Sequence, residues 1–351
     1  VYNSGGAQTA ITTAPGAIVA GRWYHMVGTF DGTSIRLYVN GQPVSIAGHQ
    51  SSWTTASTIQ FGTAFAGTSA NYGQWTGYLG DTVVYNKSLT PDQIYTHWIS
   101  SAYGAKMTFN AASGTPNDPY GAMVAADNPT VWYHMTDSAT ATSAADLASA
   151  TIAGSGFNKT VSIPATANGA AFAATTSPAL VGGTAVGFNG RGANLSIPNS
   201  TVINAVSSGT TVQKYAVELW FNASYLDGSS STYQSLYSKG DVLSGSARGF
   251  GAQLRGDGCI WAYVGGTTTG VCSPVSGILA GRWYHAVVQY SGSAFQIFLN
   301  GVVVLDWTAV ASGAQNITAP LWIGSTGNSN PLASTTSLNF RGAISEFALY
   351  N

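Results

Sequence analysis

The sequence predicts an all-β protein built of antiparallel strands, on three observations. Apolar and polar residues alternate with period two in short segments that Gly, Asn, Ser and Asp bound. Asn40-Gly41 and Asn300-Gly301 are strong hairpin signals, because both central residues of a type I′ turn need a positive φ. The chain shows no βαβ alternation, which excludes a parallel sheet with crossover helices.

The composition narrows the class of protein further. At 351 residues the chain is long enough for about two domains. Charged residues make up 7% of it and leave a formal net charge of -1, which removes the basic patch that nucleic acid requires. No apolar run approaches the ~18 residues of a membrane span, so we expect no membrane span in this segment. The chain opens at Val1 without a leader-like region, and we interpret it as a mature piece or a fragment.

An internal repeat organises the chain. Three landmarks recur in the same order: Ile18–His25 with Ile278–His285, Leu37–Gly41 with Phe298–Gly301, and Gly77–Asn86 with Gly342–Asn351. The second copy can be followed upstream to about Asp127, so the first copy begins in mid-domain. We therefore predict part of a first domain over 1–103, a linker over 104–126 and a second domain over 127–351.

Each copy predicts a meander of three strands, and the first copy ends in a helix. The predicted strands are Tyr24–Phe30, Ser34–Val39 and Pro43–Ile46 in the first copy, and Tyr284–Tyr290, Ala294–Leu299 and Val302–Trp307 in the second. Thr90 and Gln93 then form a capping box, with Ile94 and Trp98 on one face of the predicted helix.

Two strings carry a family resemblance: GRWYHMVGTFDGTSIRLYVNG and GYLGDTVVYNKSLTPDQI. They resemble the laminin-G-like branch of the concanavalin A-like lectin/glucanase superfamily, in which a Trp-x-His strand, an Asn-Gly hairpin and a closing strand recur in this order. The second copy adds similar segments at Pro129–His134, Val217–Phe221 and Ser238–Asp241. The resemblance implies two jelly-roll β-sandwiches in tandem, each of two stacked antiparallel sheets, with the first incomplete on its N-terminal side.

Tryptophan and tyrosine side chains are the first candidates for binding, because their faces stack on sugar rings. Four tryptophans lie inside strands of the repeated framework, where large aromatic residues belong in the core: Trp23, Trp132, Trp220 and Trp283. The ligand-binding candidates are instead the aromatic residues in or beside loops: Trp53, Tyr72, Trp75 and Trp307.

The titratable residues argue against catalysis. His25 and His285 occupy the same strand position in both copies, so we expect a shared structural role and propose no zinc site. Glycoside hydrolysis normally uses a pair of carboxylates, and Glu218 and Glu346 are the two glutamates of the chain. The Glu-x-Asp-x-x-Glu strand of the superfamily's glucanases is absent, and Asp81 stands where the second copy has Glu346. We therefore expect that the protein is not an enzyme.

The sequence also offers candidate sites for calcium binding and for N-linked glycosylation. The resemblance implies a calcium ion held by loop oxygens at the sandwich rim, for which Asp241 and Asp257 are the candidates. Asn-x-Ser/Thr sequons, which are no more frequent than chance, give candidate N-glycosylation sites at Asn86, Asn158, Asn194, Asn199, Asn222 and Asn316.

The two cysteines predict a disulfide across a hairpin. Cys259 and Cys272 flank Gly265-Gly266 symmetrically, and a turn there places the cysteines directly opposite each other. Cα atoms roughly 4.5 Å apart lie within the span of a disulfide. The other interpretation is two free buried thiols. A bond would support an oxidising, extracellular compartment.

Together these observations predict a non-catalytic extracellular or cell-surface protein of tandem laminin-G-like domains, which serves in adhesion or in recognition of glycans or surface proteins. The alternative is a structural subunit of an extracellular filament, surface layer or virion, in which further copies or neighbouring domains complete the first sandwich. A glycoside hydrolase, or an accessory domain of one, is the third hypothesis. Fold resemblance alone does not choose among them.

Overall fold

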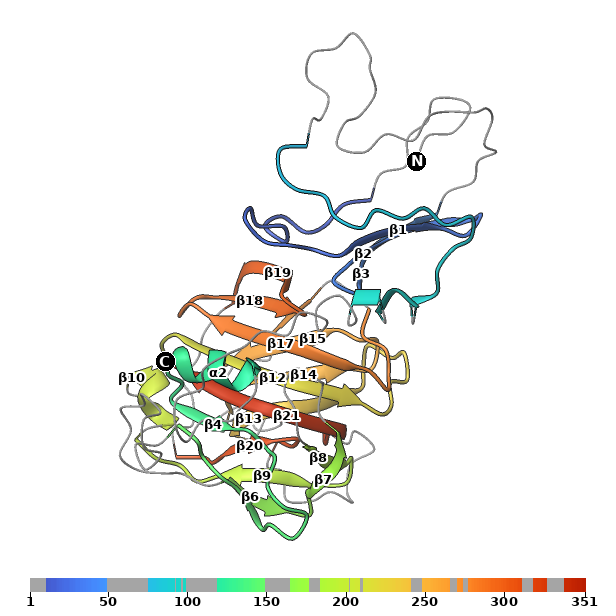
Figure 1. Ribbon diagram of the computed structural model, residues 1–351. Helices are drawn as coiled ribbons and strands as arrows, with labels where there is room; N and C mark the ends of the chain where they lie inside the picture. Colours follow the sequence, from blue (N-terminus) through green and yellow to red (C-terminus); the bar gives the residue numbers. More distant parts are fainter. Residues whose placement is uncertain are drawn as a thin grey trace.

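The computed structural model confirms the all-β prediction in the part of the chain that it describes (Figure 1). The described residues are 11–48, 75–91, 93–95, 97–98, 119–148, 165–176, 184–201, 203–208, 211–240, 248–265, 270–273, 277–310, 318–326 and 338–351. They form two eight-stranded sheets, one three-stranded sheet and a few short elements.

The two eight-stranded sheets form a complete sandwich from residue 131 onward. In spatial order, one sheet contains β19 (Val302–Ala309), β18 (Ala294–Leu299), β17 (Trp283–Tyr290), β12 (Tyr215–Ala223), β21 (Arg341–Tyr350), β8 (Thr184–Asn189) and β7 (Ala171–Thr176), with β4 (Val131–Tyr133) paired to β21. The other contains β16 (Val271–Cys272), β15 (Ile260–Val264), β14 (Arg248–Arg255), β13 (Tyr233–Gly240), β20 (Leu321–Ile323), β9 (Asn194–Ile197), β6 (Ala165–Asn168) and β5 (Ser143–Ala144). The short elements are η1 (Ile203–Val206), β10 (Ser207–Ser208) and β11 (Thr211–Val212).

The alternating pattern of β12 shows how the sequence fixes this sandwich. Val217, Leu219 and Phe221 are buried in the core between the sheets. Glu218 and Trp220 point to the outer face, because successive side chains of a strand alternate. Pairs from β12 to both β17 and β21 place it at the centre of its sheet.

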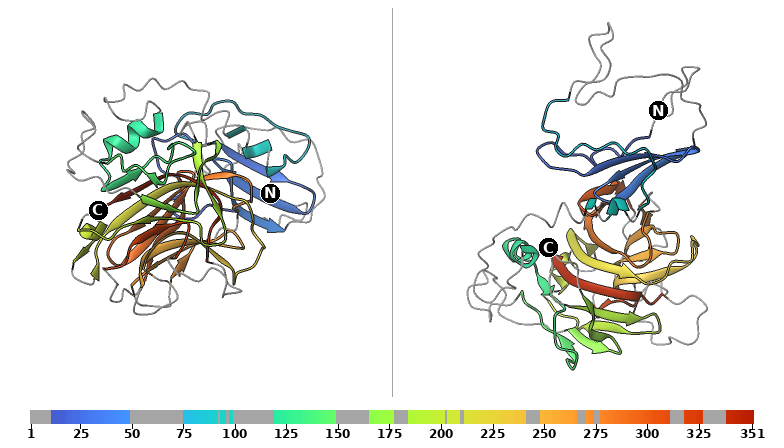
Figure 2. Two further views of the ribbon diagram at one scale, coloured as in Figure 1. Left: turned by 90° about the horizontal axis from the view of Figure 1, so that it is seen from below. Right: turned by 45° about the vertical axis from the view of Figure 1, so that its right-hand side comes forward.

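A helix lies where the sequence predicted a linker. Helix α2 (Pro119–Ala126) falls within 104–126 and packs on the outer face of the second sandwich (Figure 2). Val124 joins a small buried cluster with Trp132 and Ala348, and the Tyr120 ring lies edge-on to His285. The sequence of α2 has no strong periodic pattern and gives little sign of a helix that one sandwich face stabilises, and the domain bounds stay a prediction.

The three-stranded sheet repeats part of the sandwich. It contains β1 (Met26–Phe30), β2 (Ser34–Val39) and β3 (Gln42–Gly48). Its pairing register equals that of β17 and β18 at an offset of 260, since Met26 pairs with Val39 as Ala286 pairs with Leu299. The predicted correspondence of the two meanders is confirmed.

Hydrogen bonds at the hairpins are repeated as well. Asn40 and Asn300 both adopt a positive φ, of 50° and 51°. Asn40 Oδ1 accepts the main-chain N–H of His25 at 3.0 Å, and Asn300 Oδ1 accepts that of His285 at 2.9 Å. The capping box is present too, because Thr90 N–H donates to Gln93 Oε1 at 2.9 Å and Gln93 N–H to Thr90 Oγ1 at 3.3 Å.

The first copy departs from the prediction in its closing segment. The family resemblance implied a closing strand over Gly77–Asn86, but the structure assigns these residues to no strand. Trp23, predicted to be a core residue, is 72% exposed, whereas Trp132 and Trp220 are buried as predicted. Both differences have one cause: no described strand lies between β1 and this segment, and a strand needs a neighbour to bond.

The two units contact each other through polar and apolar groups. Tyr95 O–H donates to the carbonyl oxygen of Trp283 at 2.9 Å, and the Arg282 guanidinium lies 5.2 Å from the Tyr95 ring centroid. Val39 packs against Val302. The helical residues near Tyr95 therefore lie against the second sandwich, as Figure 1 shows.

The cysteine hairpin has a disulfide but not the predicted register. Cys259 and Cys272 are bonded, with Cα atoms 5.9 Å apart. Residue pairs of β15 and β16 join Trp261 to Cys272 and Ala262 to Val271, so Cys272 lies opposite Trp261 and diagonal to Cys259. The prediction that the cysteines lie directly opposite each other is wrong, because the centre of the hairpin lies one residue further along the chain than predicted. Because the shift keeps both cysteines on one face of the hairpin, the bond still forms.

Candidate functional site

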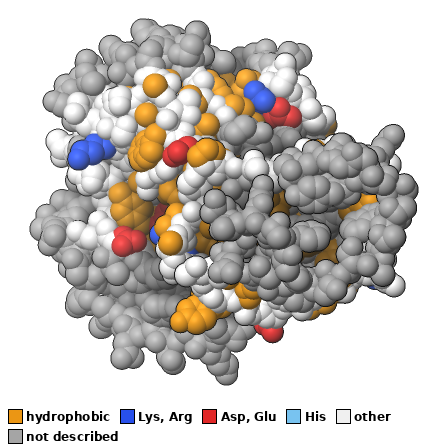
Figure 3. Space-filling model, turned by 90° about the horizontal axis from the view of Figure 1, so that it is seen from above, with side chains coloured by type: hydrophobic (Ala, Val, Ile, Leu, Met, Phe, Trp, Pro, Cys, Tyr) orange, Lys and Arg blue, Asp and Glu red, His pale blue; other side chains and the backbone are white. Residues whose placement is uncertain are grey.

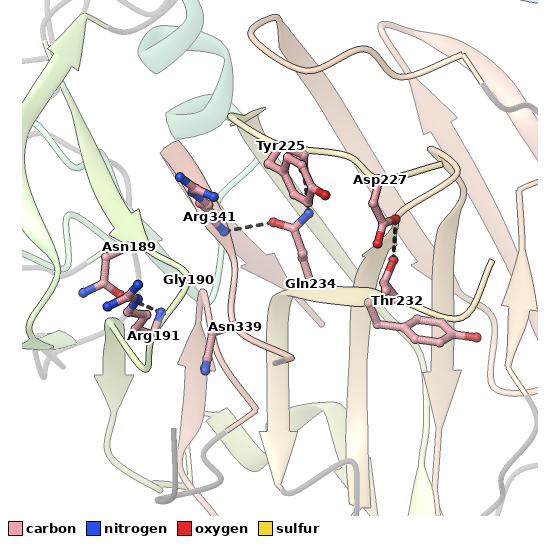
Figure 4. Close-up of a pocket in the computed structure, with 10 residues that line it drawn as sticks. Asn189, Gly190, Arg191, Tyr225, Asp227, Thr232, Gln234, Asn339 and Arg341 are labelled. Atoms are coloured by element: carbon pink, nitrogen blue, oxygen red, sulfur yellow. Dashed lines mark hydrogen bonds between the residues drawn. The ribbon is translucent and has the colours of Figure 1, made fainter. Parts of the chain in front are cut away.

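One pocket in the second sandwich brings together aromatic, basic and amide side chains. It has a volume of about 320 Å³ and lies where the β8–β9 turn, the β12–β13 loop and the start of β21 meet. Figure 4 shows the side chains that line it: Asn189, Gly190, Arg191, Tyr225, Asp227, Thr232, Tyr233, Gln234, Asn339 and Arg341. Three chain segments far apart in sequence therefore build one concave surface.

Tyr225 presents an aromatic face at this pocket. Its side chain is 52% exposed, and the guanidinium carbon of Arg341 lies 5.9 Å from its ring centroid. A cation at this distance from a ring is attracted by the electron density of its face. The ring and the guanidinium together offer a flat apolar surface beside a fixed positive charge.

Hydrogen bonds hold the segments that carry these two side chains. Gln234 Nε2–H donates to the carbonyl oxygen of Tyr225 at 2.8 Å, and Gln234 Oε1 accepts the main-chain N–H of Arg341 at 3.0 Å (Figure 4). The side chain of Gln234 therefore ties the β12–β13 loop to β21. This arrangement fixes the positions of Tyr225 and Arg341 before any ligand arrives.

The charges at the pocket are two arginines and one aspartate. Asp227 Oδ1 accepts the Thr232 hydroxyl at 2.7 Å and the Ser229 N–H at 2.9 Å. The Thr232 hydrogen bond, followed by that of Ser229, lowers the pKa of Asp227. Arg191 lies in the β8–β9 turn, where its main-chain N–H donates to Asn189 Oδ1 at 2.8 Å. The lining therefore carries a net positive charge and several groups that bond hydroxyls or carboxylates.

The aromatic candidates from the sequence do not lie at this pocket. Trp53 and Tyr72 lie outside the described residues. Trp75 is exposed in the segment beside the first sheet, and Trp307 is 49% exposed on β19. Neither lines the pocket. Their role in binding stays a prediction.

Glu218, the first of the two glutamates considered for catalysis, is part of a buried hydrogen-bond network. Its carboxylate is bonded by His285 Nε2 at 3.1 Å and by the Tyr350 hydroxyl. Burial raises the pKa of Glu218, but the hydrogen bonds from His285, Tyr350 and Tyr120 outweigh it and hold the pKa below its ordinary value. Tyr120 comes from α2, so the network fastens the helix to the sheet.

Glu346 is engaged in a second network. It is buried on β21, where it accepts Trp132 Nε1–H at 2.5 Å and pairs with His134. Burial lowers the pKa of His134 to about 4. Both glutamates thus serve packing contacts, and neither lines the pocket.

The remaining predicted sites receive different outcomes. Asp257 is bonded by Arg255 at 2.8 Å and 2.5 Å, and Asp241 lies outside the described residues, so calcium stays a prediction. Among the described residues no three His, Cys, Asp or Glu side chains gather as a metal site. Of the sequons, Asn86 and Asn199 are exposed, Asn194 and Asn222 are half-buried, and Asn158 and Asn316 lie outside the described residues.

Sequence reasoning missed the pocket residues Tyr225, Arg191 and Arg341. They lie in the β8–β9 turn, in the β12–β13 loop and at the start of β21, and the meeting of these segments depends on the sheet topology. One signal was available, because arginine is scarce in a chain with 12 Lys and Arg. Both arginines adjoin glycines, in Gly190-Arg191-Gly192 and in Arg341-Gly342.

Comparison with known proteins identifies the family to which the chain belongs. The family profile described as the concanavalin A-like lectin/glucanases superfamily matches residues 1–95 and 189–351. The chain belongs to this family, in its Laminin_G_3 branch. No curated protein matches the chain. In the described part of the chain, neither α2 nor the helical residues near Ile94 have the length and apolar character of a membrane-crossing helix.

Solved structures show similarity at low sequence identity. Domain 4 of AbnA, a GH43 extracellular arabinanase from Geobacillus stearothermophilus, was solved with arabinotriose; it is 19% identical, with a TM-score of 0.34, over 48% of this chain and 71% of its own. Trypanosoma rangeli sialidase is 14% identical, with a TM-score of 0.44, over 74% of this chain and 36% of its own. A botulinum neurotoxin serotype D/C binding domain is 10% identical, with a TM-score of 0.42, over 65% of this chain and 49% of its own. The chain thus spans about a third of the sialidase's length.

Proposed function

We propose that the protein is a non-catalytic glycan-recognition module of an extracellular surface, and that the Tyr225 pocket binds a sugar that carries a carboxylate. The observation that supports this most is the exposed Tyr225 ring with the Arg341 guanidinium beside it. An aromatic face packs against the apolar side of a sugar ring, and a guanidinium forms paired hydrogen bonds with a carboxylate.

The other pocket residues fit the same ligand. Arg191 supplies a second cation, and Asn189 and Asp227 supply groups that bond hydroxyls. A volume of about 320 Å³ lies at the small end of ligand pockets and suits one or two sugar rings rather than a long chain. The site therefore favours a terminal or short acidic glycan.

The proposal that the protein is not an enzyme rests on the carboxylates. Hydrolysis of a glycosidic bond normally needs two of them about 5 to 10 Å apart, flanking the bond. Among the residues that line the pocket, Asp227 is the one carboxylate. Glu218 and Glu346 are bound in networks away from it. The disulfide of Cys259 and Cys272 supports an oxidising compartment, in line with an extracellular location.

A glycan array probed with the intact chain tests the proposal. We expect binding to glycans that carry uronic or sialic acid residues. Tyr225→Ala and Arg341→Gln abolish it, whereas Trp307→Ala, which removes an equally exposed aromatic side chain elsewhere, leaves it unchanged. Loss of binding in Trp307→Ala with retention in Tyr225→Ala would place the site elsewhere. No binding to any acidic glycan would refute the ligand class.

The second candidate function is a structural subunit of a filament, surface layer or virion. Exposed apolar side chains on the first unit, such as Met26 at 53%, favour it, because low charge and apolar area suit surfaces that are buried against neighbours. Negative-stain electron microscopy separates the two candidates. Ordered assemblies of purified protein support the structural role, and dispersed particles that bind acidic glycans support recognition.

A further inference from the structure

The Tyr225 pocket continues onto the outer face of the sheet that contains β13, β14 and β15. Tyr233, the first residue of β13, lines the pocket. Its ring lies edge-on to the ring of Trp261 on β15, with the ring centroids 5.7 Å apart. Trp261 itself is outside the pocket lining. The aromatic pair therefore connects the pocket to a strand two places further across the sheet.

The position of Trp261 on the outer face is fixed by its neighbours. Ile260 and Ala262 are buried in the core, and successive side chains of a strand point to opposite faces. The indole is half-buried and stacks on the Tyr263 ring, with centroids 5.0 Å apart and an interplanar angle of 29°. The Tyr263 hydroxyl is in turn hydrogen-bonded to the Ser238 hydroxyl at 2.8 Å. Trp261 therefore offers a ring whose orientation is set before any ligand binds.

Polar groups on the same face have unused hydrogen-bonding capacity. Cross-strand pairing places Ser235 opposite Gln253, and Gln253 opposite Trp261. The side-chain atoms Ser235 Oγ and Gln253 Nε2 are buried and have no hydrogen-bond partner among the described residues. Buried polar groups are normally paired. An aromatic ring with spare hydrogen-bonding groups directly beside it suits a ligand rich in hydroxyl groups.

Charge divides this surface into two parts. The pocket has two arginines, Arg191 and Arg341, against one carboxylate, Asp227. At the end of β14, by contrast, Arg255 Nε–H donates to Asp257 at 2.8 Å, and the two charges cancel. Charged residues make up only 7% of the chain, and Figure 3 shows how few of them appear on one face of the molecule. The pocket therefore attracts an anionic group, and neutral groups fit the face beside it.

We propose that the pocket and this face form one extended site, which binds an oligosaccharide whose terminal sugar carries the carboxylate and whose following sugars are neutral. The inference rests on the proposed function, because it places the acidic sugar in the Tyr225 pocket. The neutral sugars pack their apolar faces against the rings of Tyr233 and Trp261. The extended site thereby distinguishes an acid at the end of a glycan from the free acidic monosaccharide.

Isothermal titration calorimetry with the intact chain measures what the neutral sugars add. Each acid is tested as the free sugar and as the terminal sugar of a trisaccharide. The pairs are sialic acid with sialyllactose, and glucuronic acid with a trisaccharide of glucuronic acid and two neutral hexoses. For the acid that the pocket takes, we expect the trisaccharide to bind about tenfold more tightly than the free sugar, because it gains the contact with the indole.

Four variants locate this gain. In Trp261→Ala we expect the trisaccharide to bind no more tightly than the free acid, whose own affinity is unchanged because the indole lies outside the pocket lining. Trp261→Phe keeps an aromatic face and retains most of the gain. Arg341→Gln weakens the binding of both ligands, because both place the carboxylate in the pocket. Trp307→Ala, the matched control at an exposed tryptophan on β19, affects neither.

A second measurement does not depend on the stability of Trp261→Ala. Circular dichroism verifies that each variant folds, and if Trp261→Ala does not, nuclear magnetic resonance of the parent chain with isotope-labelled tryptophan decides. The indole N–H signal of Trp261 is identified by its loss in Trp261→Phe. We expect this signal to shift when the trisaccharide is added and to stay in place with the free acid, whereas the signal of Trp307 responds to neither.

Three results would overturn the inference, and they separate it from the proposed function. Equal affinity for the trisaccharide and the free acid would leave the pocket as a site for the acid alone, so that the proposed function survives without the extension. A gain that persists in Trp261→Ala, or an indole signal that does not respond, would place the neutral sugars elsewhere. No binding of either acid in either form would refute the proposed function and the extended site together.

Discussion

Removal of the Cys259–Cys272 disulfide gives the sharpest test of the second sandwich. The bond spans a sequence separation of 13 and joins β16, an edge strand of two residues, to the start of β15. Two residue pairs describe the rest of the β15–β16 contact. By the chain-entropy estimate, a loop of this length stabilises the folded state by about 3 kcal/mol. We therefore expect the double variant Cys259→Ser with Cys272→Ser to lose about that free energy of unfolding.

The assay is urea unfolding followed by tryptophan fluorescence, with and without a thiol reductant. With a denaturant slope of about 3 kcal/mol per M, the midpoint of the parent falls by about 1 M on reduction. The midpoint of the double variant equals that of the reduced parent and does not respond to the reductant. An unchanged midpoint in the double variant would refute the idea that the disulfide limits the freedom of the unfolded chain at this edge.

Substitutions at three further positions, Lys239, Gly324 and Asn300, test the same sandwich. Burial lowers the pKa of Lys239 from 10.5 to about 8. Between these two pH values only the unfolded state holds the proton, so stability rises with pH across the window. Lys239→Met should remove this rise, about 3 kcal/mol, in urea titrations. Gly324→Ala places a Cβ 2.3 Å from a ring carbon of Phe188, whereas the Cβ of Gly301→Ala meets nothing within 4 Å. We expect Gly324→Ala to lose about 1 to 3 kcal/mol more stability than Gly301→Ala, measured as a larger fall in melting temperature. Equal losses would contradict this. Asn300→Gly keeps the turn but loses the bond from His285 N–H, at about 1 kcal/mol, and Asn300→Ala should cost about 1 kcal/mol more, because alanine disfavours the positive φ.

The repeated meander could be predicted from the sequence because its determinants are local. Period-two alternation, the Asn-Gly turns and the capping box at Thr90 each depend on residues within a few positions. The structure places all of them as expected, down to the same pairing register in both copies. Local signals also predicted the disulfide, and an error of one step in the turn centre left it intact because both cysteines remain on one face.

The failures share a different cause, which is dependence on distant parts of the chain. Residues 77–86 have the alternation of a strand, but a strand also needs a neighbour, and pattern alone does not report one. Helix α2 is stabilised by a sandwich face to which its own sequence gives little clue. The Tyr225 pocket brings Arg191, in the β8–β9 turn, near Arg341, at the start of β21, because β8 pairs with β21. Such sites follow from topology rather than from motif.

One central strand, β12, contributes a large part of the core of the second sandwich. In the second sandwich β12 places Tyr215, Val217, Leu219 and Phe221 in the core, each at most 3% exposed. Burial of each such side chain is worth about 1.5 to 3 kcal/mol. Four of them amount to about 6 to 12 kcal/mol, which is comparable with the whole stability of a typical domain.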